Sequence, residues 1–125
     1  MAELGIALMP LVLLAGFALT AMLVPAPVLA GVALGLIALG FVVGVPSGLV
    51  YHVLLRRALL HRGALPRGWY WAPQRHHGAL DEAGVRSLRP WFLTGALGFG
   101  LIVLGFLIAV AALLLWFRAQ QSALA

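Results

Sequence analysis

The chain has 125 residues, of which 64% are hydrophobic and 9% are charged, and its mean hydropathy is +1.10. This composition lies far from that of soluble globular domains and predicts a single integral membrane domain. The absence of cysteine excludes disulfides, thiol nucleophiles and thiolate metal sites. The formal charge of +5 comes from arginine without lysine, and the bias towards Ala, Gly, Leu and Pro hints at a GC-rich bacterial genome.

The first apolar stretch covers residues 4–24 and carries no charge. At 1.5 Å per residue, a helix of this length crosses a hydrocarbon core of about 30 Å, so we predict a first transmembrane helix there. A cleaved signal peptide is the alternative, but Glu3 replaces the expected cation and the stretch is longer than a signal-peptide core. We therefore expect the segment to be retained. Pro25 and Pro27 then end the helix in a tight turn.

Two longer apolar stretches follow. Residues 28–55 are uncharged and exceed the usual span, which predicts tilt, a kink at Pro46 or a protruding end. We expect this second helix to continue through residues 56–60 and to end at Gly63 in the left-handed conformation. Residues 91–117 predict a third transmembrane helix, followed by a short polar tail.

Residues 56–90 connect the second and third helices and hold seven of the eight arginines. Prolines and glycines predict irregular, partly extended backbone over residues 64–78. Asp81 is expected to cap a short juxtamembrane helix that has Glu82 in its first turn and Pro90 at its end. Cytoplasmic loops keep an excess of arginine, so we place this loop and the N-terminus in the cytoplasm and the C-terminus outside the inner membrane. The predicted fold is all-α, with three transmembrane helices.

Small residues indicate how the helices pack, because helices in lipid associate through close approach of their backbones. The second helix carries two sets of glycines at four-residue spacing, and at 100° per residue the two sets lie on roughly opposite faces. We predict that the second helix lies between the first and the third. A seam with another subunit or a second copy is the alternative. The candidate packing residues are Gly31, Gly35, Gly40, Gly44, Gly48, Gly98 and Gly105.

Few polar side chains occur in the apolar stretches, and none is a carboxylate, arginine or lysine. Pumps and transporters depend on ionisable groups inside the membrane, so the chain alone does not predict either. His52, near the end of the second helix, is interpreted as an interfacial histidine. A haem ligand is the alternative, and it requires a second axial histidine from a symmetric partner.

His76, His77 and Asp81 come nearest to a metal-binding pattern, since imidazole and carboxylate groups bind first-row metals. Gly78 interrupts any helix that would join them, and adjacent histidines point in different directions. We therefore predict no metal site and no cofactor, and retain these three residues as the alternative.

Aromatic residues and arginines share the middle of the loop. Tryptophan and tyrosine there fit the aromatic belt at a membrane interface. The alternative is a docking surface, since tryptophan, tyrosine and arginine dominate the energetics of protein interfaces. The candidate residues for contact with a partner or with lipid are Arg67, Trp69, Tyr70, Trp71, Arg75, His76 and His77.

No phosphate-binding loop, nucleophile elbow, catalytic triad or nucleic-acid-reading module occurs in the sequence. We therefore predict a non-catalytic accessory or assembly subunit of a membrane complex, in contact with membrane lipids and with other subunits or a second copy. One alternative is a small membrane enzyme or lipid-handling protein that uses His76, His77, Asp81 and Arg75 on phosphate-containing headgroups. Another is a haem or metal subunit of a redox complex, through His52 or His76.

Overall fold

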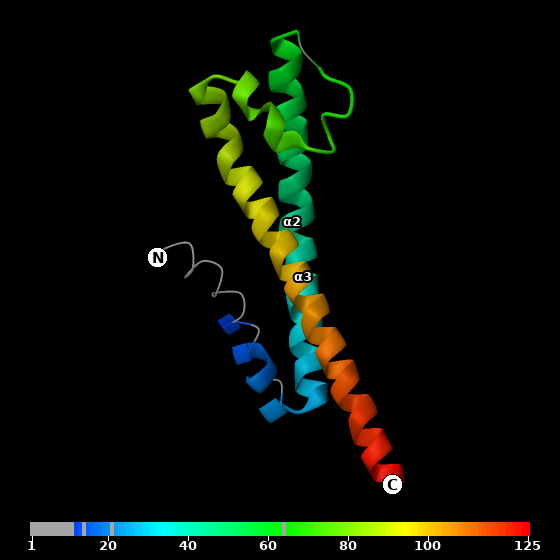
Figure 1. Ribbon diagram of the computed structural model, residues 1–125. Coiled ribbons are helices and arrows are strands. Elements are labelled where there is room, and N and C mark those ends of the chain that lie inside the picture. Colours follow the sequence, from blue (N-terminus) through cyan, green and yellow to red (C-terminus); the bar gives the residue numbers. More distant parts are fainter. Residues whose placement is uncertain (1–11, 14, 21, 64) are drawn as a thin grey trace. The chain divides into compact units, whose positions relative to one another are not determined.

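The chain is almost entirely helical in the computed structural model, which contains two long α-helices, α2 and α3, and a short 3-10 helix, η1 (Figure 1). Helices account for 86% of the described residues, and no strand occurs among them. The predicted all-α fold is therefore confirmed for this part of the chain. The structure describes residues 12–13, 15–20, 22–63 and 65–125.

The chain divides into two compact units, and α2 and α3 each contribute residues to both. The first unit comprises Met1–Leu36 and Leu104–Ala125, and the second comprises Ile37–Val103. The second unit includes the arginine-rich connection between α2 and α3, so it contains the candidate functional residues of the loop.

α2 covers Ala26–His61, begins directly after Pro25 and continues through Pro46 without a break. It contains the whole of the predicted stretch 28–55 and the predicted extension beyond it. Gly63 follows with a φ of +70°, the left-handed conformation that commonly ends a helix, so the predicted cap is confirmed. At 36 residues, α2 is longer than the roughly 20 that cross a bilayer core, and its last two turns carry the first two arginines of the chain.

α3 covers Glu82–Leu124 and is one continuous helix where the sequence predicts two. The prediction that Pro90 ends a short juxtamembrane helix is wrong, because Pro90 lies inside α3. A proline within a helix removes the hydrogen bond to the carbonyl group four residues earlier, here that of Arg86. Arg86 is exposed, so water can hydrogen-bond to this carbonyl group and the helix continues. The apolar stretch 91–117 is therefore joined directly to the polar turns before it.

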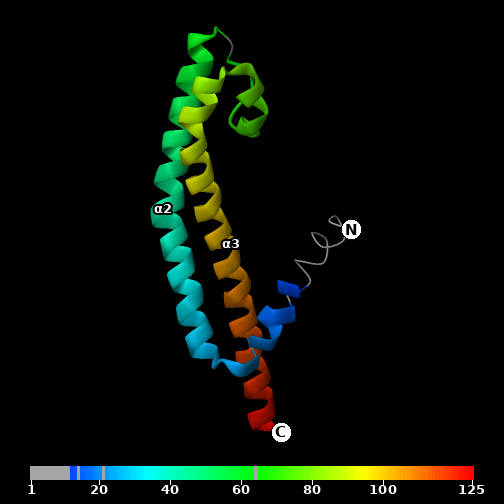
Figure 2. The ribbon, with the colours of Figure 1, turned by 90° about the vertical axis from the view of Figure 1, so that its left-hand side faces the viewer.

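The segment between α2 and α3 folds back beside the two helices (Figures 1 and 2). The prediction of irregular backbone is wrong for part of this segment, since Pro73–Ala79 form the 3-10 helix η1. A proline stands at the start of η1, where its missing amide hydrogen leaves no helical bond unmade. Before η1, the amide group of Trp69 donates to the carbonyl oxygen of Pro66 at 3.3 Å, in a turn where Gly68 has a φ of +73°.

The first predicted membrane helix, residues 4–24, is only partly described. Residues 4–11, 14 and 21 lie outside the described residues, and the remaining residues from 12 to 23 are helical. Among the described residues, α2 and α3 are the two helices long and apolar enough to cross a membrane. The predicted span at residues 4–24 stays a prediction.

In the second unit, α2 and α3 lie side by side (Figures 1 and 2). Glycines of the two helices face each other there. A Cβ atom added to Gly44 would lie 2.9 Å from the Cα atom of Gly98, and one added to Gly40 would lie 2.6 Å from the Gly98 carbonyl oxygen. One added to Gly95 would lie 3.4 Å from the nitrogen of Gly48. The two backbones are therefore in direct contact, and a larger residue at Gly40, Gly44 or Gly98 would force them apart.

The first unit packs differently. A Cβ atom added to Gly31 or Gly35 would meet no atom within 4 Å, whereas Gly105 is buried. None of the described residues therefore packs on the Gly31–Gly35 face of α2. Phe17 and Val24 instead pack against a core on the other side of α2, where larger side chains bury more apolar area than two glycines could. That core consists of Leu29, Ala33, Ile108 and Ala112.

Candidate docking site at the arginine-rich end

The polar end of the molecule, defined here as residues 51–92, has a small core of its own. Tyr51, Leu55 and Leu59 follow one another at four-residue spacing along one face of α2, and Leu88 of α3 meets them. All four side chains are at most 3% exposed. This core holds the connecting segment against both helices. The side chains that pack around it are Leu54, Trp69, Leu80 and Phe92.

A hydrogen bond joins η1 to α2. The hydroxyl oxygen of Tyr51 lies 2.7 Å from Nε2 of His77, and this is the one hydrogen bond that the hydroxyl makes among the described residues. Because Tyr51 is buried and its hydroxyl has no other partner among the described residues, we assign the hydroxyl as the donor and Nε2 as the acceptor. A neutral His77 then carries its own proton on Nδ1. The ring of Phe92 packs against both, with centroids 5.4 Å from Tyr51 and 5.7 Å from His77.

His52 is also held by its own helix. Its Nδ1 donates to the carbonyl oxygen of Gly48 at 2.8 Å, and its ring centroid lies 6.0 Å from that of Trp69. A carbonyl oxygen can only accept, so Nδ1 carries the proton and Nε2 is the remaining ring nitrogen. His52 thus positions Trp69 over the end of α2.

The structure divides the predicted contact residues into two groups. Trp69 and His77 face the core and are half-buried, as is His76. Trp71 is 82% exposed and Tyr70 is 56% exposed. An exposed tryptophan leaves a large apolar surface in contact with solvent, so the segment presents aromatic side chains for which the fold itself supplies no cover. The exposed group is Arg67, Tyr70, Trp71 and Arg75.

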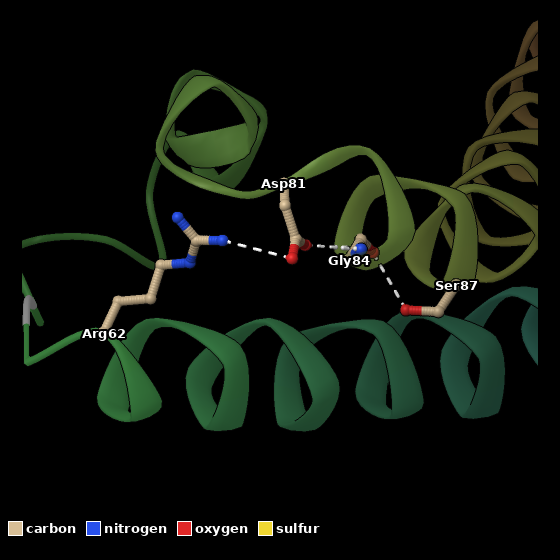
Figure 3. Close-up of polar contacts among 4 residues, drawn as sticks. All are labelled: Arg62, Asp81, Gly84 and Ser87. Carbon is tan, nitrogen blue, oxygen red and sulfur yellow. Dashed lines mark hydrogen bonds and ion pairs between the residues drawn. The ribbon is translucent and has the colours of Figure 1, made fainter.

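Asp81 acts as a helix cap (Figure 3). Its Oδ1 accepts the amide hydrogen of Gly84 at 2.8 Å, in the N-cap geometry that the sequence predicts, and this prediction is confirmed. Its Oδ2 lies 3.3 Å from a guanidinium nitrogen of Arg62. Ser87 donates to the Gly84 carbonyl oxygen in the next turn. Asp81 therefore ties the end of α2 to the start of α3.

The predicted metal alternative finds no support in this geometry. Both carboxylate oxygens of Asp81 are engaged by Gly84 and Arg62, and Nε2 of His77 is engaged by Tyr51. Within the described ranges, no group of three or more His, Cys, Asp or Glu side chains gathers as a metal site would require. His76, His77 and Asp81 are thus not brought together as ligands.

Positive charge dominates the surface of the polar end. The pair between Arg62 and Asp81 is the ion pair found in the described part of the chain, and both partners are largely exposed. An exposed pair of this kind contributes little to stability. The other six arginines make no ion pair with a described residue, so the surface attracts anions. These six are Arg56, Arg57, Arg67, Arg75, Arg86 and Arg89.

Sequence reasoning missed the roles of Tyr51, Phe92 and Arg89. Tyr51 stands four and eight residues before two buried leucines, and this spacing was the available signal that it faces α3. Arg89 and His77 line a groove of about 250 Å³ together with three apolar side chains. We call it the His77–Arg89 groove. Its residues come from two elements, so no local pattern in the sequence marks it.

Comparison of the chain with protein-family models, curated proteins and solved structures finds no match. The geometry described above is therefore the basis for the function proposed next.

Proposed function

We propose that the protein is a small, non-catalytic integral membrane protein that serves as an accessory or assembly subunit of a larger membrane complex. The observation that carries the proposal is the division within residues 67–77. Trp69 and His77 are used to fix the segment on the helix ends, while Trp71 and Arg75 are turned outward from it. The exposed group is thus held in place before any partner arrives.

Such a prepared surface suits docking better than catalysis. Tryptophan, tyrosine and arginine give the largest contributions to protein interfaces, and a surface that is already ordered loses less conformational entropy on binding. Two of the four polar side chains considered for chemistry are engaged in structural contacts, Asp81 as a cap and His77 as an acceptor for Tyr51. The partner we propose is a membrane protein subunit with an acidic or aromatic surface at headgroup depth.

The same proposal places the molecule in the membrane. α2 and α3 have the length and apolar character of transmembrane helices, and the arginines gather where α2 ends and α3 begins. The excess of positive charge favours a cytoplasmic location for the polar end, in the inner membrane of a bacterium. Residues 4–24 would form a third span, with the N-terminus in the cytoplasm and the C-terminus outside.

Single-cysteine labelling tests the membrane placement, and the chain suits it because it has no cysteine of its own. Gln74 lies in η1 and Ser122 lies near the C-terminal end of α3, and both residues are exposed. We expect Gln74→Cys to react with a membrane-impermeant maleimide only after the cells are opened, and Ser122→Cys to react in intact cells. Labelling of Ser122→Cys only from the cytoplasm would refute the orientation.

Site-specific photo-crosslinking tests the docking role. With a photo-reactive amino acid at Tyr70, we expect one membrane protein to be captured in a constant ratio, and gentle solubilisation should retain it. Trp71→Ala and Arg75→Ala should each release it. Trp116→Ala is the matched control, since Trp116 is an exposed tryptophan of the first unit. Equal capture by Trp71→Ala and Trp116→Ala would count against the proposal.

A further inference from the structure

The His77–Arg89 groove combines a cation with an apolar lining. It is lined by His77 of η1 and by Val85, Arg89, Phe92 and Leu93 of α3, and its volume is about 250 Å³. Sites for drug-sized ligands start at roughly 300 Å³, so this groove holds part of a molecule: a headgroup and the carbons next to it.

The polar groups of the groove suit an anionic oxygen. The guanidinium group of Arg89 offers a planar pair of donors that matches a phosphate or a carboxylate. Since Nε2 of His77 is the acceptor for Tyr51, the ring nitrogen left for a ligand is Nδ1, which carries a proton and can donate. Tyr51 thus leaves Nδ1 of His77 as the ring nitrogen that can donate to a ligand.

The groove follows the change from polar to apolar sequence along α3. Arg89 is the last charged residue before the apolar stretch 91–117, and Phe92 and Leu93 are among the first side chains of that stretch. A ligand that meets Arg89 with its anion and Phe92 and Leu93 with its apolar part must itself be amphiphilic. In the proposed membrane placement, the nearest molecule of this kind is a phospholipid at the boundary between headgroups and acyl chains.

Neighbouring grooves fit an anion less well. One of about 340 Å³ shares Val85 and Arg89 and adds Arg86, but it is also lined by Glu82, whose carboxylate repels an anion. Another, of about 260 Å³, lies among Tyr51, His52 and Phe99 and contains no cationic side chain among its lining residues. The His77–Arg89 groove is lined by a cation and by no carboxylate.

We propose that the His77–Arg89 groove binds the phosphate group of one anionic phospholipid, with Arg89 and Nδ1 of His77 as donors and Phe92 and Leu93 against the first acyl carbons. This inference rests on the membrane placement proposed above. It adds the binding of one lipid with a negatively charged headgroup. The bound lipid would fill the space between η1 and α3 and complete the polar end.

Native mass spectrometry of the full chain in detergent tests the site, with phosphatidylglycerol and phosphatidylcholine added in equal amounts. We expect the first retained lipid to be phosphatidylglycerol. Arg89→Gln should weaken its binding by about tenfold, the ratio expected for loss of one charge-assisted hydrogen bond. Arg56→Gln is the matched control, because it removes the same charge from the polar end without touching the groove. It should change the affinity by less than about twofold.

Other outcomes overturn the proposal. Equal binding of the two lipids by the wild type would show that the protein does not prefer an anionic lipid. Equal effects of Arg89→Gln and Arg56→Gln would show that the lipid responds to the overall surface charge and not to the groove. Displacement of the lipid by millimolar inorganic phosphate would assign the site to free phosphate. The cysteine labelling described above is independent of these results, so failure of the lipid site can be told from failure of the membrane placement.

Discussion

The two glycine pairs of α2 have the same spacing but different surroundings. Gly40 and Gly44 lie against Gly98 of α3, so closely that a Cβ atom at either position would meet its backbone. A Cβ atom at Gly31 or Gly35 would meet no atom within 4 Å. Glycines at four-residue spacing therefore allow two helices to approach closely. Whether two helices of this chain do so depends on a small residue at the facing position.

Gly44→Leu should have the largest effect, because it inserts a side chain where two backbones touch. α2 and α3 would have to separate in the second unit, and we expect the free energy of unfolding to fall by about 3 kcal/mol, the upper end of the usual cost of overpacking. Reversible unfolding in mixed micelles, followed by tryptophan fluorescence, measures the change. An unfolding midpoint equal to that of the wild type would show that the glycine contact does not hold the helices together.

Tyr51→Phe should have the second-largest effect, because it removes the hydrogen bond between α2 and η1 but leaves the ring. We expect a loss of about 1–2 kcal/mol, since a half-buried acceptor on His77 loses its donor. The same unfolding titration measures this loss. Nitrogen-15 spectra of the His77 ring provide a second readout: one tautomer, with the proton on Nδ1, in the wild type and a mixture in the variant. A mixture in the wild type would contradict the hydrogen-bond direction given above.

Asp81→Ala should cost about 1 kcal/mol, the usual value of a helix N-cap. Arg62→Ala tests the ion pair alone, because it removes only the contact with Oδ2 of Asp81. The pair is exposed, so this control should cost less than about 0.5 kcal/mol. Equal losses in the two variants would mean that the ion pair, and not the cap, stabilises the start of α3.

Gly35→Leu should have the smallest effect and completes the comparison with Gly44→Leu. The side chain enters open space, so the unfolding free energy of the isolated chain should change by less than about 0.5 kcal/mol. Sedimentation in detergent, over a range of protein concentrations, should give the same molar mass for the variant and the wild type. A large loss of stability would show that this face is covered, either by another part of the chain or by a second copy.

Local signals in the sequence predicted local structure well. Gly63 ends α2 and Asp81 caps α3 because each of these roles depends only on the neighbouring residues. The same kind of reasoning failed at Pro90, where the cost of one lost hydrogen bond is smaller than the benefit of a continuous helix that also carries Leu88 into the core. Proline is a helix-stop signal, but at Pro90 packing outweighs it and the helix continues.

Relations between distant residues could not be predicted in this way. Trp69 and Trp71 have similar neighbours in the sequence, yet Trp69 packs on the core and Trp71 is 82% exposed. The difference depends on which side of the connecting segment meets α2, and that is decided by contacts such as Tyr51 with His77, 26 residues apart. The residues predicted to contact a partner or lipid therefore include both structural and exposed side chains, and only the fold separates the two kinds.

The glycine contact also fixes the register of α2 against α3 in the second unit. Sliding α3 by one helical turn, about 5.4 Å, would replace Gly98 opposite Gly44 by a larger residue such as Ile102. That shift would force the two backbones apart, so the glycine contact favours the observed axial setting over it. Arg89 stands nine residues before Gly98 on the same helix. Its axial position relative to α2 is therefore set by the contact between uncharged glycine backbones.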